Sequence, residues 1–409
     1  MDDLPLELKQ RVCSYLTPKD LKSLRLTSRD YVAATDRYLL PRIFLFNHPD
    51  SFQEIQDITN HPDLRHSVTT LVVDTSCLRS LPKYQDWARY FEHDRSTSTN
   101  QVDARTQRSL RRDRNRARWM KYQERVLAQR SSTKSMLESI SLAFEKCPKL
   151  SNLIIECLSS NTTPGLLQKT SRFYYDIQAH EIPTSCFQLC LTSTEYCIWD
   201  LLKPVHDAGR MLESLVLLNP CITSPQDWTM PTTTIFHRLK HLRYCGDPSK
   251  SLASITIRAA ELQSIGMIGT YSEDLCSFQS LFGGSVLHNL RACSLDFLGL
   301  DENDLVQFLL RQSDTLQELR ITPESWVSRV IWRSFANRVR GQLPNLRRVR
   351  LHRLGERTRP LPNGLSTMWY LKAADILQDH AYALEIGPRE IDNGLWKEYE
   401  KLFFPGKYK

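Results

Sequence analysis

The sequence predicts a mixed α/β fold, in which a short three-helix module precedes an irregular solenoid with strands inside and helices outside. Three observations predict it. The first 45 residues contain three short segments with apolar residues at helical spacing. A block of the form L-x-x-L-x-L then recurs, mostly every 23 to 30 residues. The stretches between these blocks have helical patterns, and a strand that alternates with a helix in each repeat is the unit of a solenoid.

Composition limits the class of protein. The chain has 409 residues, of which 41% are hydrophobic and 24% charged, so it can bury a sizeable core. No stretch approaches the roughly 18 consecutive apolar residues of a membrane-spanning helix, and the acidic start does not fit a secretory signal. The 11 cysteines are scattered without a C-x-x-C pair. We therefore expect reduced thiols in a cytoplasmic or nuclear protein with no membrane association.

Residues 1–45 form the first predicted module. Its first helix starts near Pro5, because a proline suits the first helical turn, where its missing N–H has no partner anyway. The sequence TPKD from Thr17 is a second start signal, since the threonine can cap a helix and the aspartate favours its positive end. A third helix starts near Asp30. Three helices of this size cannot bury all their leucines, so an exposed apolar stripe is expected to bind another helical surface.

The order of motifs in this module is distinctive. It has a Leu-Pro start, an aliphatic face that ends in Ser-Tyr-Leu, a Pro-Lys-Asp-Leu turn, a leucine pair and a Ser-Arg step before an aromatic residue. These are Leu4-Pro5, Val12, Ser14-Tyr15-Leu16, Pro18-Lys19-Asp20-Leu21, Leu24 with Leu26, Ser28-Arg29 and Tyr31. The pattern resembles the F-box domain. Cys13 departs from it, because a large aliphatic residue is usual there, and Tyr31 stands where many members have tryptophan.

The resemblance implies that this module binds the Skp adaptor of cullin-based ubiquitin ligases. The contacts that it implies are Leu4, Pro5, Leu8, Val12, Leu16, Leu21 and Leu24. Leu8 and Leu21, together with Leu26 and Tyr31, could instead close the core of the module. A plain helical cap on the larger domain is the alternative interpretation of the whole segment.

After a linker at residues 46–65, the repeated block defines a second domain over residues 66–354. Its copies begin at Val68, Leu150, Leu212, Leu239, Leu262, Leu290, Leu316 and Leu346. They resemble the irregular leucine-rich repeats of F-box substrate receptors, of which the fungal type is the nearest in character. The asparagine or cysteine that regular repeats carry three residues after the last strand position is missing. Another helix-and-strand topology remains the alternative.

In such an array the strand residues between the leucines lie on the concave face, where solenoids bind their partners. The charged residues expected there for an unknown protein substrate are Arg243, Asp296, Glu318, Arg320, Arg348 and Arg350. An ordinary solvated face is the competing interpretation for each of them. Residues 355–409 leave the repeat and are expected to form a C-terminal cap and tail.

A basic insertion at about residues 94–134 carries the net charge. Residues 105–130 contain ten arginines and lysines against two acidic residues, an excess of eight that equals the formal net charge of +8. The segment has no proline or glycine, which favours a helix. Three roles are open: a solvated insertion helix, a signal for nuclear import or an acidic partner, and a nucleic-acid contact, which we expect least.

Motifs for enzyme chemistry are missing from the sequence. It has no phosphate-binding loop, no dinucleotide fingerprint, no nucleophile elbow and no zinc-ligand spacing. We therefore expect no catalytic residue, no metal and no cofactor. The sequence predicts the substrate-recognition subunit of a Skp-cullin-F-box ubiquitin ligase. The alternatives are an interaction scaffold outside the ligase and a nucleic-acid-associated protein that acts through Arg105–Arg130.

Overall fold

A computed structural model describes the chain over these residues: 4–75, 77–78, 83–93, 104–131, 133–156, 187–188, 198–218, 234–245, 252, 255–269, 275–282, 284, 286–296, 298–322 and 332–351. It has a mixed α/β fold with a parallel sheet, as the sequence predicted. The described residues form two compact units, one within residues 1–208 and one from residue 209 onward, and residues 151–153 belong to the second. The expected C-terminal cap at 355–409 lies outside the described residues.

The first unit begins with helices α1 (Leu6–Cys13), α2 (Pro18–Thr27) and α3 (Asp30–Leu39). Thr17 caps α2 as expected, in a reciprocal capping box with Asp20. Pro5 was expected inside the first helical turn, but it stands one position earlier, as the N-cap. Its carbonyl there accepts the amide N–H groups of Leu8 and Lys9, each at 3.1 Å, so it closes the first turn from outside.

Residues 46–65, expected to be a linker, contain helix α4 (Pro49–Asn60) and the short 3-10 helix η1 (Leu64–His66). On either side, strands β1 (Arg42–Phe46) and β2 (Thr70–Asp74) pair in parallel. The helix buries Phe52, Ile55 and Ile58, which are three residues apart on one face. The segment is therefore a packed β–α–β crossover, whose helical spacing is visible in the sequence.

The first unit continues with α5 (Tyr84–His93), α6 (Ala104–Ser131), α7 (Thr133–Lys146) and α9 (Ile198–Asp207), and with the antiparallel pair β3 (Cys77–Leu78) and β5 (Phe187–Gln188). It also contains residues 154–156 of strand β4 (Asn152–Glu156). The predicted basic helix is α6. Buried Trp87 of α5 packs against buried Tyr122 of α6, with ring centroids 6.5 Å apart. An aromatic contact thus holds α5 against the basic helix.

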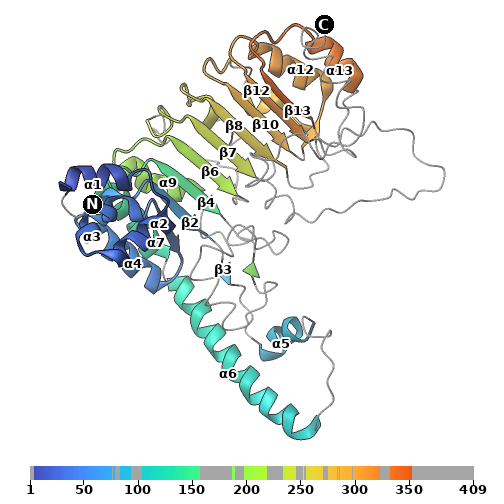
Figure 1. Cartoon of the computed structure of the whole chain (residues 1–409). Coiled ribbons are helices and arrows are strands. Elements are labelled where there is room, and N and C mark those ends of the chain that lie inside the picture. The colour runs from blue at the N-terminus through green and yellow to red at the C-terminus, as the bar shows by residue number, and fades with distance from the viewer. Residues whose placement is uncertain are drawn as a thin grey trace. The chain divides into compact units, whose positions relative to one another are not determined.

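The second unit is built on parallel strands that follow one another in chain order: β6 (Ser214–Leu218), β7 (His241–Cys245), β8 (Ser264–Ile268), β10 (Ala292–Asp296), β12 (Glu318–Thr322) and β13 (Arg348–Leu351). Figure 1 shows them side by side. The unit also contains α11 (Phe278–Phe282), α12 (Glu302–Arg311), α13 (Trp332–Val339) and the short parallel pair β9 (Leu275–Cys276) and β11 (Gly299–Leu300). Equivalent block positions align from strand to strand, so Leu242, Ile265, Cys293 and Leu319 form one buried row.

One backbone hydrogen bond repeats from strand to strand in the second unit. The residue before each strand donates its N–H to the carbonyl of its counterpart before the previous strand, at 2.8 Å each time, in Lys240, Gln263, Arg291, Gln317 and Arg347. Asparagines add a second tie, because the side-chain amides of Asn289 and Asn345 donate to the carbonyls of Ala260 and Asp314. These asparagines stand one residue before the first leucine of their blocks. They join neighbouring blocks from a position different from the one at which regular repeats carry their asparagine.

The helices of this unit pack through aromatic residues. The ring of Phe308 on α12 stacks on Phe278 and Phe282 of α11, with centroids 4.9 and 4.8 Å away. All three rings are fully buried. Among the described helices, none has both the length and the apolar character needed to cross a bilayer.

Candidate functional site

Helix α1 shows an inverted distribution of polar and apolar side chains. Its buried residues are Lys9 and Cys13, whereas Leu8 and Val12, also four residues apart, are exposed by 47% and 38%. Tyr15, three residues after Val12, is 79% exposed. A helix of a self-sufficient domain normally buries its apolar stripe and exposes its lysines. The exposed apolar side of α1 therefore fits a surface that another protein covers.

Further apolar side chains are exposed in the same module. Ten large apolar side chains are exposed among the described residues, and five of them lie within the first 26 positions: Leu6, Leu8, Val12, Tyr15 and Leu26. Single exposed leucines are common, but such a concentration within 21 residues is not. We call these five side chains the apolar surface of the N-terminal module.

The core of the module has a different set of residues. Cys13, Leu21 and Ala34 are fully buried, and Leu16, Leu24, Tyr38 and Leu39 pack around them half-buried. Cys13 thus fills the site where a large aliphatic residue was expected, as a small apolar side chain, and burial raises the pKa of its thiol.

The residues expected to bind the adaptor therefore differ in position. Pro5, Leu8 and Val12 are exposed, Leu4, Leu16 and Leu24 are half-buried, and Leu21 is 1% exposed in the core. The adaptor contacts expected from the sequence did not include Leu6, although it stands between Leu4 and Leu8, which were both included. Burial of Leu21 could not be read from spacing, because the spacing identifies an apolar position without identifying what covers it.

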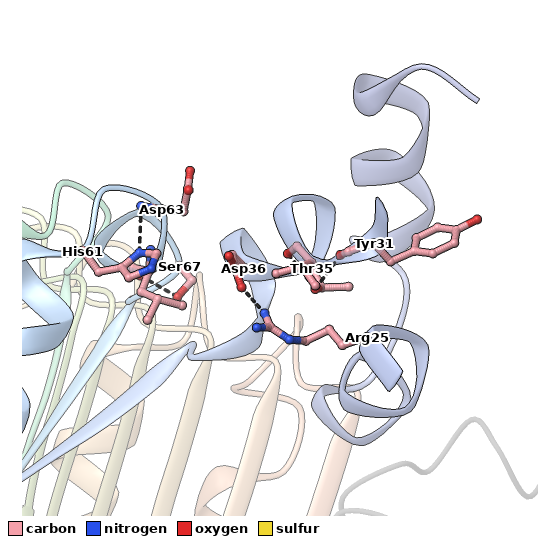
Figure 2. A network of polar contacts seen from close by, with 9 residues as sticks. Arg25, Tyr31, Thr35, Asp36, His61, Asp63 and Ser67 are labelled. Carbon is pink, nitrogen blue, oxygen red and sulfur yellow. Dashed lines mark hydrogen bonds and ion pairs between the residues drawn. The ribbon is translucent and has the colours of Figure 1, made fainter. Parts of the chain in front are cut away.

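Polar contacts hold the module in shape. Arg25 of α2 forms an ion pair with Asp36 of α3, and Thr35 donates to the carbonyl of Tyr31 at 2.7 Å (Figure 2). The ammonium of Lys9 lies 5.4 Å from the centre of the Tyr31 ring, within the range of a cation–π contact. The contact with Tyr31 gives the buried Lys9 of α1 a favourable partner, and the other two contacts hold α2 and α3 in place.

A second candidate surface lies in the second unit, on the strand face opposite the buried leucines. The pairing register aligns Arg243, Gly266, Ser294, Arg320 and Arg350 in one row across β7 to β13. Two further aligned residues on this face, Glu318 and Arg348, form an ion pair at 2.9 Å. The side chain of Arg350 lies outside the described residues. The charged residues selected from the sequence thus share one sheet face.

Asp296 lies beside this row. Its carboxylate accepts a hydrogen bond from Ser294 at 2.9 Å and forms an ion pair with Arg320 at 3.3 Å, and its side chain is 3% exposed. Burial lowers the pKa of Arg243, while the nearby Asp296 carboxylate acts in the opposite direction. The buried Asp296 carboxylate therefore opposes the effect of burial on the Arg243 guanidinium.

A metal ion is held by a group of side chains that lie close together. Within the part of the chain that is described, no three His, Cys, Asp or Glu side chains lie close enough together to hold a metal ion.

The side chains of the basic helix α6 that are described include exposed Arg116, Lys121, Met120 and Leu127, so this helix presents both positive charge and apolar groups.

Comparison with known proteins adds one match. The family model of the F-box domain matches residues 1–31, which contain α1, α2 and the start of α3. The chain carries an N-terminal F-box domain. No curated protein matches the chain. Four of the five residues of the apolar surface lie on or next to α1 of this F-box, and the fifth, Leu26, lies on α2.

Proposed function

We propose that this protein is the substrate-recognition subunit of a Skp-cullin-F-box ubiquitin ligase. F-box domains typically bind the Skp adaptor and so link their chain to a cullin. The observation that carries the proposal is that the matched segment exposes Leu8 and Val12 on one side of α1, and Tyr15 just after it, while it buries Lys9. That side is apolar and helical, which suits a groove formed by helices of another protein.

In this proposal the adaptor contacts come from Leu4, Pro5, Leu8 and Val12, with Leu16 and Leu24 at the edge of the interface. Leu21 supports the contacts from inside the core, since its side chain is already covered. Full burial of a leucine or valine contributes about 1.5–3 kcal/mol. Two half-exposed side chains can therefore account for a large part of the affinity.

The region from β6 to β13 serves, in this proposal, as an irregular leucine-rich-repeat solenoid that holds the substrate on its concave face. Parallel strands in chain order, the repeated 2.8 Å hydrogen bond and the aligned buried leucines support it. Each block buries its apolar side against its neighbours, which is how solenoids gain stability. The protein has no catalytic role of its own here, and acts by bringing substrate and ubiquitin-carrying enzyme together.

Co-purification of the full chain with the Skp adaptor tests the proposal. Each of the substitutions Leu8→Ala and Val12→Ala is expected to weaken adaptor binding about tenfold, which corresponds to about 1.4 kcal/mol. The matched control is Met211→Ala with Ile257→Ala, which truncates two exposed apolar side chains of the second unit. Wild-type protein that fails to bind the adaptor, or a loss of binding in the control variant as large as in Leu8→Ala or Val12→Ala, would contradict the proposal.

Two other functions have distinct tests. An interaction scaffold outside the ligase binds the adaptor but does not co-precipitate a cullin. A nucleic-acid-associated protein acts through α6, where Arg116 and Lys121 are exposed. That function predicts binding to DNA or RNA that falls steeply with salt and is lost when residues 104–131 are deleted.

A further inference from the structure

We infer that the face formed by Arg243, Arg320 and Arg348 binds an extended acidic segment of the substrate, with carboxylates on these arginines. The inference rests on the proposed function and names the class of substrate. It is carried by the position of the arginines on one strand face and by the buried Asp296, which forms an ion pair with Arg320 and lies near Arg243.

The arginines differ in how well they are neutralised. Asp296 lies 3.3 Å from the Nε of Arg320, longer than the roughly 2.7–2.9 Å of an optimal charge-assisted pair. Arg243 forms no direct ion pair with any described residue, and burial lowers its pKa. Half-buried guanidinium groups that are incompletely paired gain most from an added anion, because water screens them poorly.

Gly266 has no side chain, and this leaves space for the side chain of Arg243. Gly266 is its neighbour in the row, and a Cβ at that position would stand 3.5 Å from the Cγ of Arg243. The arginine therefore extends over the glycine, in the direction of β10 and Asp296. A bulkier residue at position 266 would occupy this space.

The spread of the charges favours a peptide over a compact anion. The arginines are distributed over β7, β12 and β13, and neighbouring strands lie about 4.8 Å apart. The four steps from β7 to β13 therefore cover about 19 Å, which an extended chain spans with about six residues at 3.3 Å each. One phosphoryl group cannot contact arginines that are so far apart.

The exposed fraction of the charged side chains differs from one strand of this face to the next. Arg348 is 72% exposed and its partner Glu318 51%, whereas Arg320 is 25% exposed. Arg348 can therefore exchange Glu318 for a substrate carboxylate at little cost, since exposed ion pairs contribute little. Arg320 stays in place on Asp296 and provides the fixed part of the site.

The test uses the full chain purified with the Skp adaptor and two fluorescent octapeptides, (Ala-Glu)4 and (Ala-Gln)4. We expect the glutamate peptide alone to bind, more weakly as salt rises, and at least tenfold more weakly to Arg243→Ala with Arg348→Ala. The matched control is Arg238→Ala with Arg340→Ala, which removes two exposed arginines elsewhere in the second unit and should leave binding unchanged. Arg320→Ala leaves Asp296 buried without its ion pair and can unfold the unit, so the first pair of variants decides.

Several outcomes would overturn the inference: no binding of the glutamate peptide, equal binding of both peptides, equal losses in both pairs of variants, or tighter binding of a phosphoserine peptide or a DNA oligonucleotide to this face. Adaptor co-purification is measured on the same samples. Wild-type protein that does not bind the adaptor counts against the proposed function. Wild-type protein that binds the adaptor but not the glutamate peptide counts against this inference alone. Loss of peptide binding only in the Arg243→Ala with Arg348→Ala variant, with adaptor binding intact, supports the inference.

Discussion

The F-box and the strands of the second unit differ in which residue types they bury and which they expose. Helix α1 exposes Leu8 and Val12 and buries Lys9, whereas β10 and β12 bury Leu295 and Leu319 and gather Asp296 and Arg320 on the other face. The first arrangement leaves an apolar surface that, in the proposed function, the adaptor covers. The second already covers its apolar residues with neighbouring strands and helices. A leucine pattern thus predicts burial, but it does not say which molecule provides the cover.

The largest expected effect is in the second unit. Phe308→Ala removes the ring that stacks on both Phe278 and Phe282 and leaves a cavity in a closed core. We expect a loss of about 3–5 kcal/mol in the free energy of unfolding, measured by urea denaturation. Ile257→Ala, at an exposed position, is the control and should change it by less than about 0.5 kcal/mol. Similar values for the two variants would show that the aromatic core is not tightly packed.

Within the F-box, Leu21→Ala should destabilise the module by about 2–4 kcal/mol, because the side chain is buried against Cys13 and Ala34. Leu8→Ala should leave the stability of the free protein nearly unchanged while it weakens adaptor binding. Hydrogen exchange of α1 to α3, with and without adaptor, separates the two effects. If Leu8→Ala destabilises the free module as much as Leu21→Ala does, α1 does not present a free apolar surface.

Buried cysteine makes stability depend on pH in the alkaline range. Burial raises the pKa of Cys293 far above its ordinary value of 9.0, so the folded protein keeps the proton that the unfolded chain releases above pH 9. Stability from this group is complete below pH 9 and falls above it, by about 1.4 kcal/mol per pH unit. Unfolding measured between pH 8 and 10 should show a smaller loss in Cys293→Ala than in wild type. The same slope in both would contradict a buried, protonated thiol.

The smallest of these effects concerns helix capping. Thr17→Ala removes the reciprocal capping box with Asp20 at the start of α2 and should cost about 1 kcal/mol. Thr17→Ser keeps the hydroxyl group and serves as the control. Thermal unfolding and adaptor affinity should both decline slightly for alanine and remain unchanged for serine. An equal decline for both variants would point to the threonine methyl group instead of the cap.

Much of the fold could be predicted because its signals are local. The spacing of leucines anticipated the parallel strands, since a side chain on a strand alternates between two faces and each block marks the buried one. The crossover helix α4 was missed, although Phe52, Ile55 and Ile58 have helical spacing. Its apolar face is short and lies between the F-box pattern and the first leucine block, which have stronger signals. The asparagine ties of Asn289 and Asn345 were missed since they come one residue before each block, where the regular repeat has none.

The sequence by itself determined the α/β class, the F-box segment, the basic helix and the apolar face of each strand, because each depends on neighbours within about ten residues. Tertiary structure alone decided that Leu21 is covered while Leu8 is not, and that Asp296 lies against Arg320. Those relations join residues from different helices or strands. Burial and charge pairing depend on the distance between such elements in space, which periodicity along the chain does not contain.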